Sequence, residues 1–432
     1  MESTQQLPGL LTAFGGRREE EPAWLRDLRQ QARDRFESVG FPSSKLEEWK
    51  NTSVAAIAST DYAPAPAGGS AAFAGHPALD FCARRLVFVD GRLDTELSTG
   101  LGDRDGVWVG TLAQARDQQA QLTESLLARR VAPESQPFAA LNTALFDDAT
   151  VIRAHGAAAE PIHVLHLASR TEQPAASFPR LLVQVDAQAE LKLVESFFGA
   201  EGAEGLTCSV CEIDVADNAG LEHVRLQFES GNAHHVGNAH ATVARSGRYA
   251  CHAFDFGAKL ARVDSTAKLN GEGSNCLLNC LYLVSDKQHV DNHTTLDHAM
   301  PHGDSREVYK GILADNARAV FNGRIRVQLD AQKTDAKQSN PNLLMTEGAL
   351  VHTRPQLEIY ADDVKCTHGA TIGELDAEAM FYLQSRGIGS TEARNMLVRG
   401  FAAELLDQVP VESVRQFLEE AFGRRLDAIR TA

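Results

Sequence analysis

The chain has 432 residues, an apolar fraction of 43% and a formal net charge of −16, from 42 basic and 58 acidic side chains. This length exceeds one compact core and predicts several domains or an elongated solenoid. The acidic balance argues against a nucleic-acid or anionic-membrane partner. No apolar run approaches the roughly 20 residues that cross a bilayer, and the start, MESTQQLPGLL, lacks the basic region and apolar core of a secretory signal. We therefore expect a cytoplasmic protein, whose seven cysteines are reduced thiols.

The first 149 residues combine helical and strand patterns. Residues 21–40 carry apolar side chains at helical spacing, and Gly40-Phe41-Pro42 ends this pattern. The Ala/Pro/Gly-rich stretch 63–75 is typical of a linker. We expect a mostly helical N-terminal domain over residues 1–149, with further helices at 44–54, 111–130 and 137–146 and short strands at 85–91 and 107–109.

From Thr150 onward, short apolar or alternating runs follow one another for more than two hundred residues. The run RIRVQLD (324–330) alternates, which predicts that Ile325, Val327 and Leu329 point inward. No helix-length segment interrupts these runs, which argues against a βαβ fold. Many short strands fit a sandwich, a barrel or a β-helix, but only a β-helix lengthens simply by adding turns. We therefore predict a parallel β-helix core over residues 150–370.

The stretch 361–388 changes from strand-like to helical and contains Cys366-Thr367-His368-Gly369 at the change. In an extended segment Cys366 and His368 project from one face, because side chains two apart point the same way. The plain interpretation is a buried thiol beside a hydrogen-bonded imidazole. The functional interpretation is a ligand pair at an exposed edge, since the strand pattern ends at Cys366 and a helix begins at Asp376. Another subunit would then complete the ligand set.

Residues 371–432 are predicted to form a helical domain. The first helix spans 376–385, and the second runs from Ser390, its expected N-cap, to Val409. Gly400 in the middle of the second helix costs about 1 kcal/mol relative to Ala, which indicates close packing or a partner surface there. Such helices either cap a solenoid or bind a partner. A third helix follows from apolar residues four apart, namely Val414, Leu418, Phe422 and Leu426.

Several long motifs occur in order and resemble one known family. They are SSKLEEWKNT (43–52), AVFNGRIRV (319–327), AQKTDAKQSNPNLLM (331–345), PQLEIYADDVKC (355–366) and KCTHGATIGELDAEAMFYLQSRGI (365–388). Together they resemble the SufB/SufD family of iron–sulfur cluster assembly proteins, with Asn51 where the family usually carries an aromatic residue. The sequence CTHGAT is similar to the SufD form, because the SufB form carries Glu where this chain has Gly369.

This resemblance implies a right-handed parallel β-helix flanked by N-terminal and C-terminal helical domains. It implies a scaffold rather than an enzyme, which pairs with a SufB-like paralogue as a heterodimer and binds a SufC-like ABC-type ATPase. A nascent iron–sulfur cluster would form at the interface of the two β-helices. His368, with Cys366, matches the residues that take part there. The region that the resemblance assigns to ATPase binding contains Arg386, Gly387, Ile388, Met396 and Phe401.

The chemistry of Cys366 and His368 agrees with that role. Thiolate and imidazole both bind iron, and imidazole suits a cluster that must leave its scaffold. Two ligands are fewer than the four that a cluster typically takes, so we expect no stable cofactor on the isolated chain and only a transient cluster in the complex. A homodimer in isolation and direct binding of a flavin both stay open.

Two enzyme hypotheses from other classes compete with the scaffold. His289, His293, His298 and His302 lie within fourteen residues, alongside Asp291 and Asp297, and could serve a metal-dependent enzyme. On strands, however, His289, Asp291 and His293 share one face while His298 and His302 fall on the other, as in a solvated polar ladder. The other hypothesis is a β-helix enzyme acting on polysaccharide, which needs carboxylates along an exposed groove and usually an export signal.

The remaining Cys and His pairs are interpreted as structural. Cys208 and Cys211 have C-x-x-C spacing, but residues three apart in a strand face opposite sides. Cys276 and Cys280 share a strand face and are expected to be buried thiols. His234-His235 lies in a turn-rich stretch and is expected to be exposed.

Overall fold

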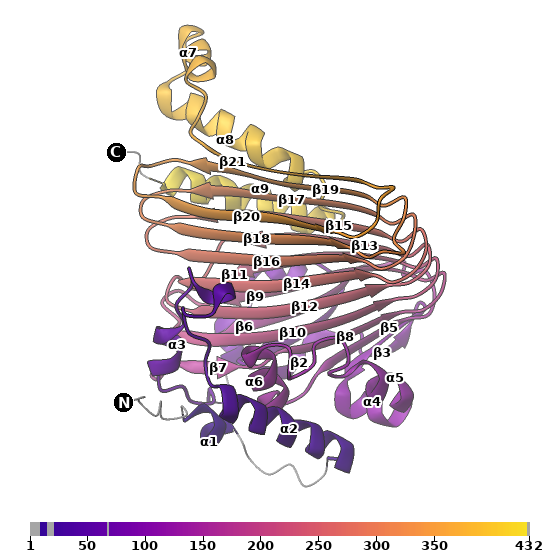
Figure 1. Cartoon of the computed structure of the whole chain (residues 1–432). Helices are drawn as coiled ribbons and strands as arrows, with labels where there is room; N and C mark the ends of the chain where they lie inside the picture. The colour runs from indigo at the N-terminus through magenta and orange to yellow at the C-terminus, as the bar shows by residue number, and fades with distance from the viewer. Residues whose placement is uncertain (1–8, 15–20, 67–68, 430–432) are drawn as a thin grey trace.

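The chain folds as a parallel β-helix of about eight turns with helices at its N-terminal and C-terminal sides (Figure 1). The computed structural model describes residues 9–14, 21–66 and 69–429. Residues 1–8 of the N-terminal stretch and residues 67–68 of the predicted linker lie outside these ranges. The predicted fold class is confirmed.

Two sheets form the walls of the solenoid, and each full turn contributes one strand to each sheet. The ten-stranded sheet contains, in spatial order, β2 (Arg92–Thr99), β1 (Arg84–Val89), β6 (Ile162–Ala168), β9 (Glu190–Gly199), β11 (Gly220–Phe228), β13 (Arg248–Asp255), β15 (Asn275–Val284), β17 (Asp304–Leu313), β19 (Asp335–Leu344) and β21 (Lys365–Gly373). The eleven-stranded sheet contains β20 (Leu350–Ile359), β18 (Arg318–Val327), β16 (His289–His298), β14 (Leu260–Leu269), β12 (His234–Val243), β10 (Gly205–Val215), β8 (Arg180–Val185), β5 (Thr150–Ala154), β4 (Val107–Thr111) and β3 (Gly102–Arg104), with β7 (Ala175–Ser177) paired to β10.

The sheets begin before residue 150. β1 pairs in parallel with β6, and β4 pairs antiparallel with β5, so strands from the first 149 residues extend both walls. Residues at the corners between the sheets adopt positive φ, for example Asn218 at 57° and Gly273 at 67°. Such residues turn the chain tightly enough to start the next strand directly.

The space between the sheets is filled by the inward side chains of alternate residues, most of them aliphatic. Ile325 and Val327 are fully buried there, as their alternation predicts. Leu329 is 69% exposed, so the prediction that it points inward is wrong. β18 ends at Val327, and Leu329 lies in the following turn, where strand alternation no longer applies.

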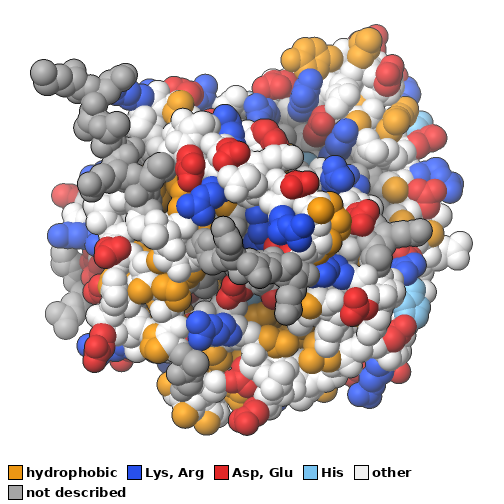
Figure 2. All heavy atoms as spheres, turned by 90° about the horizontal axis from the view of Figure 1, so that it is seen from below, with side chains coloured by type: hydrophobic (Ala, Val, Ile, Leu, Met, Phe, Trp, Pro, Cys, Tyr) orange, Lys and Arg blue, Asp and Glu red, His pale blue; other side chains and the backbone are white. Residues whose placement is uncertain are grey.

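The N-terminal helices cover the outer face of the eleven-stranded sheet, around Val151, Leu182, Leu206 and Val236. In Figure 2, which views the molecule from below, acidic and basic side chains lie interspersed on the surface. The predicted helix at 44–54 is instead a short 3-10 turn followed by a separate helix. The elements are α1 (Leu10–Phe14), α2 (Ala23–Val39), η1 (Glu47–Trp49), α3 (Ala55–Ser59), η2 (Gly69–Phe73), η3 (Pro77–Asp80), α4 (Leu112–Gln118), α5 (Ala120–Leu126) and α6 (Pro137–Leu145).

In the described residues after the solenoid, the chain forms α7 (Ala377–Ser385), α8 (Ser390–Leu406) and α9 (Glu412–Ala428). The buried faces of α8 and α9 pack on the outer face of the ten-stranded sheet. α7 buries none of its residues and projects beyond the end of the solenoid (Figure 1). Among the described residues, we find no helix with the length and apolarity that a membrane span requires.

Candidate functional site at the open end of the solenoid

Both sheets end in a strand that is paired on one side only. β21 is the last strand of the ten-stranded sheet, and β20 is the last strand of the eleven-stranded sheet. Both lie at the end of the solenoid from which α7 projects (Figure 1). An unpaired strand edge presents a row of free N–H and C=O groups, which is a template for another strand.

Cys366 and His368 both lie on β21, in register with Ala336 and Gln338 of β19. Cys366 is half-buried and packs against the interior apolar cluster, whereas His368 is exposed. Because the two residues are two apart in a strand, both side chains belong to the inward face at the open end. Partial burial is the main effect that raises the pKa of the Cys366 thiol, and the Asp335 carboxylate adds to it; a hydrogen bond from the Ala336 backbone opposes both.

The segment between Cys366 and the C-terminal helix is itself part of the last strand. The sequence pattern predicted that the strand ends at Cys366, but β21 continues to Gly373 through its pairing with β19. The edge position expected for His368 is confirmed, and the residue lies on a strand rather than in a loop. The helix predicted over 376–385 is α7, and Asp376 is its N-cap, since the Asp376 carboxylate accepts from the N–H groups of Glu378 and Ala379.

The backbone of β21 directs its free polar groups to the open edge at these same residues. The N–H of Lys365 donates to Thr334 O of the neighbouring segment, at 2.8 Å. Because backbone direction alternates along a parallel strand, Cys366, His368 and Ala370 point their N–H and C=O groups away from β19. A strand that added to this edge would therefore pair beside the thiol and the imidazole.

Apolar side chains accompany this edge. Ile372 of β21 is 49% exposed, and Tyr360, just after β20, is 59% exposed. Sequence reasoning missed these residues, although Pro355 within the β20 pattern was a usable signal. A proline in a strand marks an edge, because it has no N–H to donate to a neighbouring strand.

The residues predicted to bind an ATPase lie in and around α7 and α8. Met396 is exposed, and Arg386 lies over the Tyr382 ring at 5.2 Å from the ring centroid. Gly387 has a φ of 87° and ends α7. The described surface of α7 adds Phe381, which is 72% exposed and was not singled out from the sequence.

Phe401 differs from the other predicted residues of this region because it is half-buried. Its ring packs against the cluster under α8, and Lys310 Nζ lies 4.9 Å from its centroid. Gly400 beside it has open space where a Cβ would stand, so close packing does not explain this glycine. The exposed part of the predicted surface is therefore the α7–α8 region around Met396.

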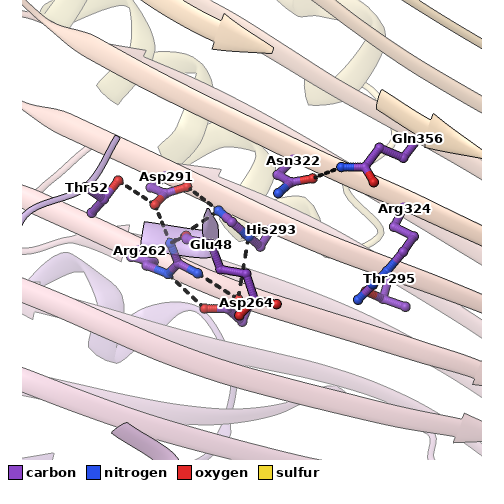
Figure 3. Close-up of polar contacts among 10 residues, drawn as sticks. All are labelled: Glu48, Thr52, Arg262, Asp264, Asp291, His293, Thr295, Asn322, Arg324 and Gln356. Carbon is purple, nitrogen blue, oxygen red and sulfur yellow. Dashed lines mark hydrogen bonds and ion pairs between the residues drawn. The ribbon is translucent and has the colours of Figure 1, made fainter. Parts of the chain in front are cut away.

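The histidine-rich strand β16 belongs to a different site, on the outer face of the eleven-stranded sheet (Figure 3). His289, Asp291 and His293 share this outer face, as predicted. Thr52 Oγ1 donates to Asp291 Oδ2 at 2.6 Å and lies 2.9 Å from His289 Nε2. The His298 side chain instead points into the interior, where its Nε2 lies 2.9 Å from Ser305 Oγ.

Arg262 lies at the centre of this outer cluster and is fully buried. It donates to Asp264, to Asp291 at 2.6 Å and to the backbone oxygen of Glu48 at 2.7 Å (Figure 3). Its Cζ also lies 3.7 Å from the centroid of the Trp49 ring. Burial raises the pKa of Asp291, but the Arg262 guanidinium and hydrogen bonds outweigh this effect and hold it at about 2. The cluster therefore fastens the N-terminal segment to the solenoid.

A cleft of about 500 Å³ lies beside this cluster, between residues 47–52 and the outer face of β16, β18 and β20. Its walls carry both charges, since Arg354 forms an ion pair with Glu47 at 2.6 Å. Within the described ranges, no three or more His, Cys, Asp or Glu side chains gather in an arrangement that could hold a metal ion. The histidines of 289–302 thus provide no ligand set for a metal-dependent enzyme.

The remaining Cys and His pairs lie in the walls and interior of the solenoid. Cys208 contacts the cluster under the N-terminal helices while Cys211 faces the interior, so the prediction of opposite faces is confirmed. Cys276 and Cys280 are buried in the interior, as predicted. The expectation that His234-His235 is exposed is wrong, because both side chains are buried in β12, and His235 Nδ1 lies 2.8 Å from the buried Glu229 carboxylate.

Comparison with known proteins places this architecture in a family. Residues 166–401 match the family model described as SUF system FeS cluster assembly, SufBD core domain, and residues 2–155 match the SufBD protein N-terminal region. The iron-sulfur cluster assembly protein SufD of Escherichia coli is 33% identical over 98% of this chain and 96% of its own length. A SufBD family protein of Synechocystis is 32% identical over 94% of this chain and 92% of its own, and SufD of Bacillus subtilis is 23% identical over 94% and 95%.

The family models and the relatives together span both the N-terminal elements and the solenoid with its open end. They favour iron–sulfur cluster assembly over an enzyme acting on polysaccharide. The chain therefore belongs to the SufB/SufD family of iron–sulfur cluster assembly proteins and is SufD-like.

Proposed function

We propose that this chain is a non-catalytic scaffold subunit of a SUF assembly complex. It pairs through β20 and β21 with a SufB-like paralogue, binds a SufC-like ABC-type ATPase through α7 and α8, and contributes His368 and Cys366 to a nascent iron–sulfur cluster. The cluster is the cargo of the complex and is passed on.

The open end of the solenoid supports this proposal most directly. The last strand, β21, carries a thiol and an imidazole on its inward face. At the same residues its free backbone N–H and C=O groups point to the open edge, away from β19. A second β-helix that continued either sheet would cover Ile372 and Tyr360 and bring its own ligands next to His368. In the absence of the paralogue, the same edges can take a second copy of this chain.

The ligand count explains why a partner is needed. Iron–sulfur clusters are usually held by four protein ligands, and this end of the chain offers two. The isolated chain should therefore hold no stable cluster. The partner completes the ligand set, and a site shared between two chains opens when they separate.

The exposed aromatic and apolar residues of α7 and α8 support the ATPase contact. Phe381, Tyr382 and Met396 are exposed by 72%, 58% and 46%. Large exposed apolar side chains that gather on two successive helices mark a protein-interaction surface. α7 projects from the same end of the solenoid as the edge strands, so an ATPase bound there would lie beside the paralogue.

Co-expression tests the proposed partners. We expect a tagged full-length chain, produced with the SufB-like and SufC-like proteins of the same organism, to purify with both. A variant with Ala370→Pro removes an N–H that points to the open edge and costs no hydrogen bond within the chain. The amount of paralogue that co-purifies with this variant should fall more than tenfold, while the amount of ATPase should not change. The matched control Thr367→Ala should retain both partners.

Two results would contradict the proposal. One is purification of the folded chain without either partner. The other is full retention of the paralogue by Ala370→Pro, which would show that the edge of β21 is not the contact.

A further inference from the structure

A file of inward side chains leads from the interior of the solenoid to His368. Glu307 of β17 is in register with Gln338 of β19, and Gln338 is in register with His368 of β21. Neighbouring strands lie about 4.8 Å apart, so in-register side chains on one face are neighbours. Gln338 is therefore one strand behind His368, and Glu307 is two strands behind it.

The two inner members of this file are buried polar groups. Glu307 is 1% exposed and Gln338 is 4% exposed. Gln338 Nε2 donates to Glu307 Oε2 at 2.6 Å. Burying a carboxyl and a carboxamide in an aliphatic core is costly unless their hydrogen bonds are satisfied.

One oxygen of each group is left over. Within the part of the chain that the structure describes, Gln338 Oε1 and Glu307 Oε1 have no hydrogen-bond partner. Because Nε2 is committed to Glu307, Oε1 is the remaining polar atom of Gln338. The next residue in the file is His368, whose exposed ring can turn toward it.

The opposite sheet leaves room for this arrangement. Gly323 of β18 faces the carboxamide, and a Cβ at Gly323 would lie 2.4 Å from Gln338 Nε2. Any other residue there would displace the carboxamide. Gly323 thus leaves the space that the carboxamide occupies, and Glu307 binds its Nε2.

We infer that Gln338 is a positioning residue for His368. Its free Oε1 accepts an N–H of the His368 ring, and Glu307 holds the carboxamide in the required orientation. An imidazole that donates one N–H presents the lone pair of its other nitrogen, which is the form that binds iron. The consequence for cluster formation rests on the proposed function of His368, whereas the hydrogen bond itself does not.

The hydrogen bond can be tested on the isolated full-length chain. Nitrogen-15 labelling of histidine reports which ring nitrogen carries the proton, and the His368→Ala spectrum identifies the His368 signals. At pH 8 we expect Gln338→Met to change the tautomer ratio of His368 about fivefold, the effect of losing one hydrogen bond. Glu307→Gln keeps an acceptor for Gln338 Nε2 and should preserve the ratio, whereas Glu307→Leu should not. An unchanged ratio in Gln338→Met would overturn the inference.

The consequence is tested on the reconstituted complex with its partners. We expect Gln338→Met to lower cluster yield about tenfold, as for the loss of a hydrogen bond that orients a ligand, without loss of either partner. The control Asn292→Leu replaces another buried interior amide outside the file and should leave the yield unchanged. A normal yield in Gln338→Met with an altered tautomer ratio would overturn the positioning role. A normal yield in His368→Ala would instead refute the proposed function, while the tautomer ratio would still decide the hydrogen bond.

Discussion

Glu307 is a buried acid whose protonation is linked to stability. Burial outweighs the opposing effects of the Gln338 carboxamide and the Thr294 hydroxyl and raises the pKa of Glu307 from 4.5 to about 7. Between these two values the folded chain binds more protons than the unfolded chain. The contribution of Glu307 to stability is therefore complete below pH 4.5 and is lost as the pH rises through 7.

Glu307→Gln should remove this pH dependence. The free energy of unfolding of the variant, relative to wild type, should rise by about 2–3 kcal/mol between pH 5 and pH 8. Urea unfolding at both pH values measures it. Asp304→Asn at the half-buried start of the same strand serves as a control and should show no comparable change. A constant difference for Glu307→Gln across this range would show that Glu307 is ionised throughout.

Arg262 should be among the residues on which the N-terminal elements depend most. Arg262→Met leaves the Asp291 carboxylate buried without its cation, and we expect a loss of about 3–5 kcal/mol in the free energy of unfolding. Arg324→Met removes a nearby exposed guanidinium that lies 3.8 Å from Glu358, and should change stability by no more than about 0.5 kcal/mol. Equal effects of the two substitutions in urea unfolding would contradict the anchoring role of the cluster.

At the scale of elements, most of the helices and strands could be predicted from strand alternation and helical spacing of apolar residues. The apolar positions Val414, Leu418, Phe422 and Leu426 form the buried face of α9, as their spacing predicted. The length of a strand and the burial of a side chain were harder to predict where they depend on residues distant in the sequence. β21 extends to Gly373 through its pairing with β19, and His235 is buried beside the Glu229 carboxylate.

The α7–α8 surface makes a prediction of its own. Met396→Glu should weaken binding of the ATPase more than tenfold, because an unpaired charge buried in an interface costs more than about 1.4 kcal/mol. Leu46→Glu is a matched control, since Leu46 is also a half-exposed apolar residue, at 52%, on a different face. Co-purification with the ATPase measures both. Retention of the ATPase by Met396→Glu, with the paralogue also bound, would place the ATPase elsewhere.

For the whole molecule, the sequence predicted a β-helix with helices before and after it. The residue at which the solenoid begins was harder to predict, because β1–β4 lie among helices and join sheets whose other strands come later in the chain. The structural role of the N-terminal motif at residues 43–52 could not be predicted from the sequence either. Trp49 and Thr52 contact Arg262 and Asp291, more than two hundred residues away, and no local pattern reports such a contact.

The central claim is that the open end of this solenoid supplies half of a shared cluster site. It is tested most directly by cluster reconstitution on the purified complex, with wild type, His368→Ala and the outward-facing control Thr367→Ala compared by the absorbance and iron content of the product. We expect Thr367→Ala to match wild type and His368→Ala to form at least tenfold less cluster while all subunits stay bound. Normal rate and yield of cluster on the His368→Ala complex would contradict the claim.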